Sequence, residues 1–205
     1  MKKKIIITIS IVLALAILAG GAYYYRAKKT STNPTVNSDS ALTALAEKYP
    51  TLVESVKQVE SEQAKMASDP TNIQYHFGLG MAWKGLADRV HDLKLPEYKD
   101  YYQKALDVYV DGINLTQRKN TILLINAGNM QKYMDNYETA EEYYKEAIAV
   151  SPGDASNYIV LTDLYENYLK KSEAEIIAVF EEGEKRVLNP TFLETYKKQY
   201  LGRIK

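Results

Sequence analysis

Three side chains that can hydrogen-bond a polypeptide fall at helical spacing in one stretch of the chain. Asn126, Asn129 and Tyr133 are separated by three and then four residues, and residues at these offsets lie on the same face of an α-helix. An amide both donates and accepts hydrogen bonds, and a tyrosine adds apolar area beside its hydroxyl. We therefore expect this face to bind an extended peptide or a partner helix.

Residue types that carry catalysis do not form a recognisable site in the sequence. His76 and His91 are the two histidines, 15 residues apart, and there is no cysteine and no H-E-x-x-H arrangement, so we expect no zinc site. The adjacent acids Glu141-Glu142 point to different parts of a helix. The glycines of residues 78–80 fall in a helical pattern rather than in a phosphate-binding loop. We expect no enzyme activity, no metal and no cofactor.

The elements that would position the two asparagines are visible around them. Gly128, Ala140 and Ala147 are small, Tyr144 is aromatic, and Pro152 closes the stretch. This spacing is typical of two short antiparallel helices in close backbone contact. It resembles the tetratricopeptide repeat (TPR), whose period is about 34 residues and whose pattern ends in A-x3-F and then P. The resemblance implies an all-α fold, a right-handed superhelix of antiparallel helix pairs, and a function in binding other proteins.

A degenerate copy of the pattern follows on the C-terminal side. Leu161 and Tyr165 repeat the first-helix marks, and Ala174 and Ala178 come 34 residues after the alanine and tyrosine of the central unit. The closing Pro190 comes 38 residues after its counterpart. We therefore expect the second helix of this repeat to be about one turn longer.

Another copy precedes the central unit and contains an insertion. Residues 79–83 read LGMAW and match the L-G-x-A-Y signature of the family. Gly80 and Ala105 are 25 residues apart where the central unit has 12, so about thirteen residues are inserted around positions 87–100. Because proline stops a helix, we expect residues 91–96, which end in Pro96, to form most of this excursion.

These copies predict the domain organisation. We expect repeats at about 73–119, 121–154 and 155–190, with end helices at 41–67 and 190–202, all within a repeat domain of residues 41–205. End helices are needed because a terminal repeat would otherwise expose its inner face. In the last end helix, one apolar face is expected to contain Phe192, Tyr196, Tyr200 and Leu201.

The N-terminal segment has a different composition. Lys2, Lys3 and Lys4 precede an apolar run that, with its closing tyrosines, covers residues 5–25. As a helix this run is about 31 Å long, against a hydrocarbon core of about 30 Å. We interpret residues 1–29 as one transmembrane anchor and residues 30–40, rich in Ser, Thr, Asn and Pro, as a flexible spacer. A signal peptide cleaved before Tyr23 is the alternative.

Charge bears on location and partners. Basic residues flank the apolar run on both sides, which only mildly favours a cytoplasmic N-terminus and an extracytoplasmic repeat domain. A cleaved chain would be secreted. Beyond residue 29 the chain has 20 basic and 26 acidic residues, a formal charge of −6. Nucleic-acid binding needs clustered positive charge, so we expect no nucleic-acid partner.

In the family that the chain resembles, the first helix of each repeat lines a concave groove that contacts the ligand. The resemblance implies partner-binding residues at the corresponding positions, which are Phe77, Met81, Lys84, Asn126, Asn129, Lys132, Tyr133, Ile159 and Asp163. We predict a membrane-tethered, non-enzymatic adaptor that binds a peptide or partner helix through this groove. The alternatives are a self-assembling component of a cell-envelope complex, which would form homo-oligomers, and a secreted TPR protein.

Overall fold

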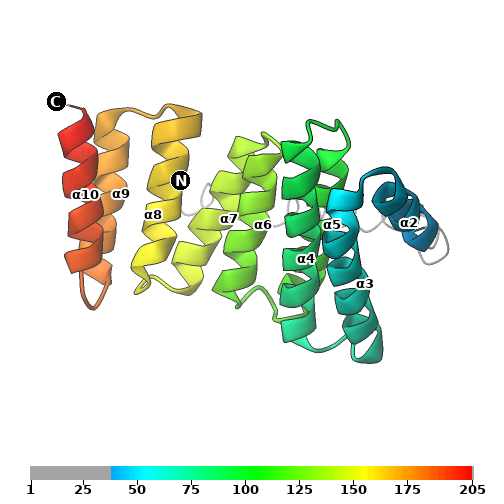
Figure 1. The fold of residues 1–205 in the computed structure, drawn as a ribbon. Helices are drawn as coiled ribbons and strands as arrows, with labels where there is room; N and C mark the ends of the chain where they lie inside the picture. The colour runs from blue at the N-terminus through cyan, green and yellow to red at the C-terminus, as the bar shows by residue number, and fades with distance from the viewer. Residues whose placement is uncertain (1–37, 205) are drawn as a thin grey trace, which may run out of the picture. The chain divides into compact units, whose positions relative to one another are not determined.

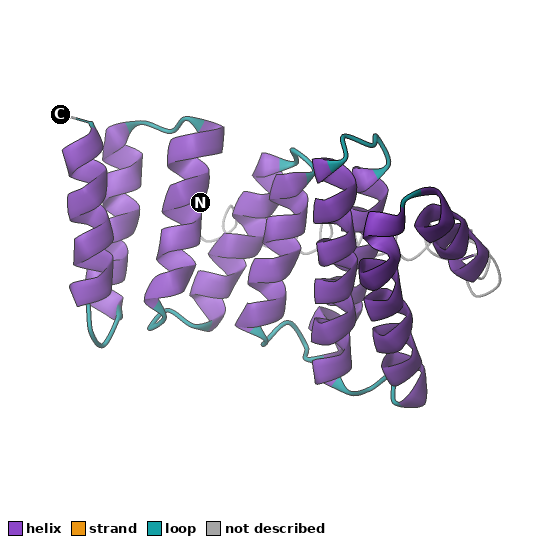
Figure 2. Ribbon diagram, viewed as in Figure 1, coloured by secondary structure: helices purple, strands orange, loops and turns teal. Residues whose placement is uncertain are grey.

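The computed structural model describes residues 38–204, so the predicted anchor and most of the predicted spacer lie outside the described residues. Every regular element within residues 38–204 is a helix (Figures 1 and 2), which confirms the all-α prediction. None of the helices in this range is long and apolar enough to cross a membrane. The chain divides into two units, residues 1–45 and 46–205, and the second contains the repeats.

The described residues form a series of helices joined by short turns. In chain order they are α2 (Ser38–Lys48), the short turn η1 (Pro50–Leu52), α3 (Val53–Ser68), α4 (Ile73–Asp92), α5 (Tyr98–Leu115), α6 (Thr121–Tyr133), α7 (Tyr137–Val150), α8 (Ala155–Leu164), the π-helical turn η2 (Tyr165–Leu169), α9 (Glu173–Arg186) and α10 (Thr191–Arg203).

Within the second unit, each helix from α3 to α10 packs against the next one along the chain. Figure 1 shows α4, α6, α8 and α10 in one layer, with α5, α7 and α9 behind them. We call the first group the leading helices, the second group the second helices, and the exposed side of the leading helices the leading face. A continuous buried cluster runs from Ala140 and Tyr144 on α7 through Tyr158 on α8 to Leu193 on α10.

Close contact between paired helices depends on two glycines of the leading helices. A Cβ atom at Gly128 would lie 2.5 Å from Cε1 of Tyr144, and a Cβ atom at Gly80 would overlap the ring of Tyr109. Both tyrosines are fully buried, as is Ala140 beside the Gly128 contact. Each tyrosine ring therefore lies directly on the backbone of the preceding helix, which is the packing that the small-residue spacing predicts.

The inserted residues extend two helices, and the predicted excursion at residues 91–96 was wrong. α4 has 20 residues against 13 in α6, and α5 has 18 against 14 in α7. About two turns are added to the end of α4 and about one to the start of α5. Leu86 and Val90, four residues apart and fully buried, keep α4 helical past the point where α6 ends. Pro96 lies in the short turn between the helices, where it breaks nothing.

The third repeat is displaced by two residues from the predicted period. Ala174 and Ala178 are exposed, and the buried positions come 36 residues after those of α7, at Ile176, Phe180 and Gly183. The displacement arises in the wide turn η2, which is followed by Lys170 in the left-handed conformation (φ 51°). α9 and α7 both have 14 residues, so the predicted longer second helix was also wrong. The loops after α7 and α9 are both four residues long, and Pro190 is the last residue of its loop where Pro152 is the second.

The glycine contact can be tested by substitution. Gly128→Leu is expected to lower the free energy of unfolding by about 1–3 kcal/mol, because the added carbons overlap the buried ring of Tyr144. The matched control is Gly85 in α4, where a Cβ atom would meet nothing within 4 Å. Gly85→Ala is expected to raise the free energy of unfolding by about 0.5–1 kcal/mol, because alanine favours the helix. Urea denaturation measures both, and a Gly128→Leu variant as stable as the parent would contradict the packing.

Candidate partner-binding face

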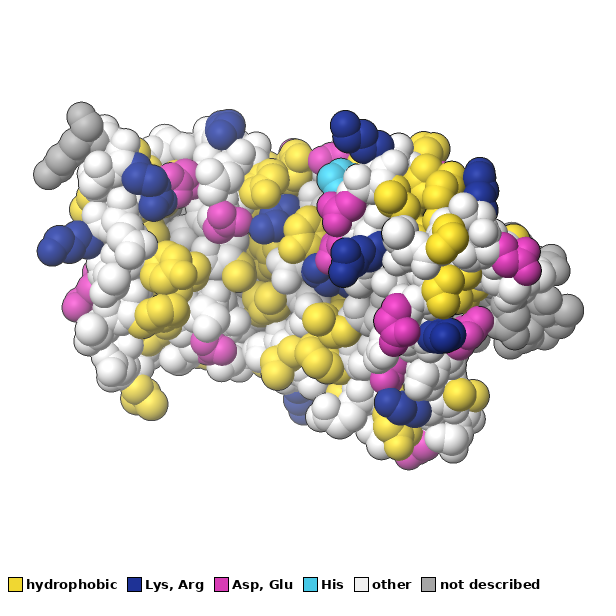
Figure 3. Space-filling view, in the orientation of Figure 1, with side chains coloured by type: hydrophobic (Ala, Val, Ile, Leu, Met, Phe, Trp, Pro, Cys, Tyr) yellow, Lys and Arg dark blue, Asp and Glu magenta, His cyan; other side chains and the backbone are white. Residues whose placement is uncertain are grey.

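All nine predicted partner-binding residues lie on leading helices. Phe77, Met81 and Lys84 are on α4, the next four are on α6, and Ile159 and Asp163 are on α8. Contacts bring members of neighbouring helices together: Lys84 Nζ lies 5.4 Å from the ring centre of Tyr133, and Lys132 Nζ lies 3.0 Å from Asp163 Oδ2. Figure 3 looks onto this side of the molecule, where hydrophobic side chains gather around α6 and α8.

Six charged side chains on the leading face form three pairs with each other. The three pairs are Lys84–Asp88, Lys132–Asp163 and Arg203–Glu166, with N–O distances of 2.6, 3.0 and 2.7 Å. The side chain of Lys132 is only 13% exposed. A lysine held in this way by a carboxylate of the same chain is poorly placed to grip the carboxylate of a peptide, so the face offers a partner mainly neutral contacts.

The two asparagines of α6 are partly used by the chain itself. Asn129 Oδ1 accepts a hydrogen bond of 2.7 Å from the hydroxyl of Tyr144. Burial raises the pKa of that hydroxyl, which keeps it a donor. Asn126 Nδ2 donates to the carbonyl oxygen of Ile122, one turn earlier. Asn129 therefore holds the helix pair together, and its amide nitrogen is the group left to face a partner.

Tyr109 repeats the packing of Tyr144 but has no acceptor. Its ring lies against Gly80 as that of Tyr144 lies against Gly128, yet the residue after Gly80 is Met81 where α6 has an asparagine. Its buried hydroxyl has no hydrogen-bond partner in the part of the chain that the structure describes. Burial raises the pKa of this hydroxyl, so it remains protonated. The first repeat thus contains a donor without an acceptor.

α10 contributes aromatic side chains to the leading face, contrary to the sequence analysis. Phe192 is 54% exposed and Tyr196 is 39% exposed, with ring centres 5.1 Å apart. The predicted single apolar face was wrong because Leu193 and Tyr200, seven residues apart, are the buried residues of α10. This turns Phe192 and Tyr196 outward.

A signal for these residues is present in the sequence. α10 and α6 each begin at a threonine and have 13 residues, so they match position by position. In this match, Phe192 corresponds to Ile122, which is 60% exposed, and Leu193 corresponds to the buried Leu123. α10 is therefore a fourth leading helix, and its exposed side continues the leading face.

A hollow of about 330 Å³ lies between α8 and α10. Predicted residues Ile159 and Asp163 line it, and the residues of α9 and α10 that complete it were not predicted from the sequence. The lining residues on these two helices are Phe180, Tyr196, Gln199 and Arg203. The aromatic rings and the hollow are adjacent because Tyr196 belongs to both.

The extended ends of α4 and α5 brace the first repeat against the second. Lys99 Nζ lies 2.7 Å from Asp135 Oδ2 in the turn after α6, and hydrogen bonds from Lys99 and Tyr137 lower the pKa of Asp135. The Tyr102 ring centre lies 5.2 Å from that of Tyr133, and its hydroxyl donates to Asp88 at 2.7 Å. Aromatic rings and an ion pair therefore connect the first two repeats at this end of their helices.

Comparisons with known proteins identify the fold. No protein-family model and no curated protein matches the chain. The structure is similar to TTC0263, a thermophilic TPR protein of Thermus thermophilus, at 21% identity over 92% of this chain and 95% of that chain, with a TM-score of 0.58. Two MamA structures match with lower TM-scores: "Crystal structure of MamA" (17% identity, 68% of this chain, 72% of that chain, 0.47) and "MamA MSR-1 C2" (15%, 77%, 81%, 0.48). The first likeness confirms a TPR-like fold and, at this identity, concerns the fold alone.

The two buried tyrosines should respond differently to loss of the hydroxyl. Tyr144→Phe is expected to lower the free energy of unfolding by about 0.5–1.5 kcal/mol, because it breaks the bond to Asn129. Tyr109→Phe is expected to leave stability unchanged or raise it, because it removes a buried donor that has no acceptor. Urea denaturation of the pair provides its own control. Equal losses in both variants would show that Tyr109 has an acceptor.

Proposed function

We propose that the chain is a non-enzymatic interaction module that binds a peptide or helix of a partner protein on the leading face. The observation that carries this proposal is the distribution of exposed apolar side chains. Leading helices expose Met81 (42%), Ile122 (60%), Phe192 (54%) and Tyr196 (39%), whereas the exposed large apolar residues of the described second helices are Leu115 and Val150, each the last residue of its helix. Apolar side chains gathered on one face support a binding site.

The chemistry of the face favours a partner with apolar anchors. Six of its charged side chains are matched in three pairs within the chain, so long-range attraction through them is weak. The Asn129 amide nitrogen and the ring of Tyr133 provide hydrogen bonding and aromatic area between apolar neighbours. In the right-handed superhelix that the TPR resemblance implies, this face would be the concave side, where a peptide or helix can lie across successive helices.

We also propose that residues 5–25 tether this module to a membrane, with the repeats outside the cytoplasm. Support comes from the length of the apolar run and its basic flanks. A secreted form produced by cleavage before Tyr23 is the competing proposal.

Self-assembly by end-to-end stacking is less favoured. A further helix pairing with α10 would contact the positions that are buried in α6 as Leu124 and Gly128. In α10 the corresponding residues are Glu194 and Lys198, both exposed and charged. Charged side chains at these positions close the row of helices against another copy.

The leading face can be tested by a pair of matched double variants. Ile122→Ser with Phe192→Ser is expected to weaken capture of a partner about tenfold, equivalent to about 1.4 kcal/mol, because both remove exposed apolar anchors. Leu115→Ser with Val150→Ser makes the same chemical change at the ends of second helices and should leave capture unchanged. The measurement is the affinity of the purified partner that photo-crosslinking identifies in native membranes. Equal weakening by both double variants would remove the leading face as the binding site.

The tether can be tested by extraction. The full-length chain should stay with membranes in alkaline carbonate, because a spanning helix is not released by high pH. A fragment that starts at residue 30 should appear in the supernatant and serves as the control. Mature protein that begins at Tyr23 and is recovered from the soluble extracytoplasmic fraction would replace the anchor with a cleaved signal peptide.

A further inference from the structure

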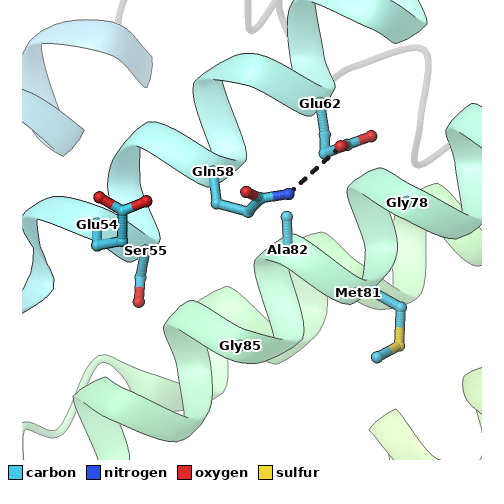
Figure 4. A pocket seen from close by; sticks show the side chains of 8 residues that line it. All are labelled: Glu54, Ser55, Gln58, Glu62, Gly78, Met81, Ala82 and Gly85. Carbon is cyan, nitrogen blue, oxygen red and sulfur yellow. Dashed lines mark hydrogen bonds between the residues drawn. The ribbon is translucent and has the colours of Figure 1, made fainter.

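An open hollow of about 420 Å³ lies between α3 and α4, separate from the predicted residues of α6 and α8. Figure 4 shows α4 contributing small residues to it, while α3 contributes polar side chains along the opposite wall. We call it the α3–α4 hollow. Its lining residues are Gly78, Met81, Ala82 and Gly85 on α4, and Glu54, Ser55, Gln58 and Glu62 on α3.

The hollow exists because one large side chain of the repeat is missing. Gly85 comes five residues after Gly80, as Tyr133 comes five residues after Gly128. In the second repeat the ring of Tyr133 fills this place and contacts Tyr102. In the first repeat a Cβ atom at Gly85 would meet nothing within 4 Å. Space for one long side chain is therefore open on this part of α4.

The wall of the hollow is acidic. Glu62 is only 7% exposed, and Lys65 and Gln58 donate to its Oε1 at 2.7 and 3.3 Å, so that oxygen is matched within the chain and Oε2, on the side of Gly78, is the one left to accept from a ligand. Glu54 is exposed at the same wall, and none of the residues lining the hollow is basic. A long cationic side chain is the complementary occupant, because its methylene groups can lie over glycine and alanine while its charged end reaches the carboxylates.

The hydroxyl of Tyr109 gives an independent indication of a ligand. Tyr144 packs on Gly128 and donates to the next residue, Asn129. Tyr109 packs on Gly80 in the same way, so by analogy with Tyr144 we infer that its unsatisfied hydroxyl faces the next residue, Met81, which lines the hollow. Methionine is flexible and its sulfur is a weak acceptor. A backbone carbonyl of a bound peptide can satisfy this hydroxyl if the side chain of Met81 moves aside.

We propose that the α3–α4 hollow binds an arginine side chain of an extended peptide segment, with a neighbouring peptide carbonyl accepting from Tyr109. The inference rests on the proposed function, since the peptide belongs to the protein bound on the leading face, and it adds a residue preference to that function. The formal charge of −6 beyond residue 29 favours approach of a basic segment. Arginine suits the site because its planar, always charged group binds carboxylates through paired hydrogen bonds.

The residue preference is measured with four pools of immobilised nonapeptides and the purified full-length chain. The central residue is fixed as arginine, citrulline, leucine or glutamate, and the other positions are mixed. Retention by the arginine pool is expected to exceed that by the citrulline pool at least about fivefold, because citrulline keeps the shape and lacks the charge. Equal retention by these two pools would overturn the proposal.

Variants locate the preference. Gly85→Tyr should abolish the difference between arginine and citrulline, because it supplies the side chain that fills the hollow, and Gly85→Ala should preserve it. Glu54→Gln should reduce it without relying on the folding of Gly85→Tyr, whose helix content is checked by circular dichroism. Tyr109→Phe should weaken retention of the arginine pool at unchanged stability, whereas Tyr144→Phe should not weaken retention. An arginine preference that survives both Gly85→Tyr and Glu54→Gln would place the basic side chain elsewhere.

The outcomes separate this proposal from the broader one. Retention of the leucine pool that is lost in the Ile122→Ser and Phe192→Ser double variant, without any arginine preference, would keep the leading face as a binding site and overturn the hollow. Arginine preference that persists in that double variant would support the hollow and count against the leading face. Failure of all four pools to be retained would overturn both.

Discussion

Contact between a tyrosine ring and the backbone of a glycine holds each of the first two helix pairs together. Tyr109 on Gly80 and Tyr144 on Gly128 leave no room for a Cβ atom, so the distance between paired helices is set by the thickness of an aromatic ring. The layers, the leading face and the positions of its side chains follow from that distance. The third pair uses Phe180 at the corresponding buried position, and its leading helix has Thr162 in place of the glycine.

The same contact explains why neighbouring repeats differ in chemistry. A tyrosine in this position brings its hydroxyl to the next residue of the leading helix, and that residue decides whether the hydroxyl is satisfied. Asn129 accepts the hydrogen bond of Tyr144, whereas Met81 provides no partner for Tyr109. In the third repeat, Phe180 has no hydroxyl, and Asp163, at the position of Asn129, pairs with Lys132. One position per repeat therefore decides whether a buried hydroxyl has a hydrogen-bond partner and contributes to stability.

Features encoded by local spacing could be predicted from the sequence, and features that depend on packing could not. Helix pairs and their glycine contacts follow from small and aromatic residues at fixed offsets. The structure of the inserted residues could not be predicted in this way, because Pro96 is compatible both with a long loop and with a short turn between extended helices. The π-helical turn at Tyr165 leaves no local signature, so the 34-residue period matches Ala174 and Ala178 to Ala140 and Tyr144, although the buried residues of α9 come two positions later. The role of Asn129 depends on Tyr144, 15 residues away, whose hydroxyl direction only the fold determines.

The brace formed by the ends of α4 and α5 also has a mechanical consequence. Lys99 contacts Asp135 in the turn after α6, and Tyr102 contacts Tyr133. The first two repeats are therefore joined by these side chains as well as by the packing of α5 against α6. The turn between the leading and second helices of the third repeat instead contains a wide π-helical segment and a left-handed residue. Under tension, the first two repeats should behave as a stiff block, and strain should concentrate in the third. A load applied through the chain would then reshape the α8–α10 hollow before it disturbs the α3–α4 hollow.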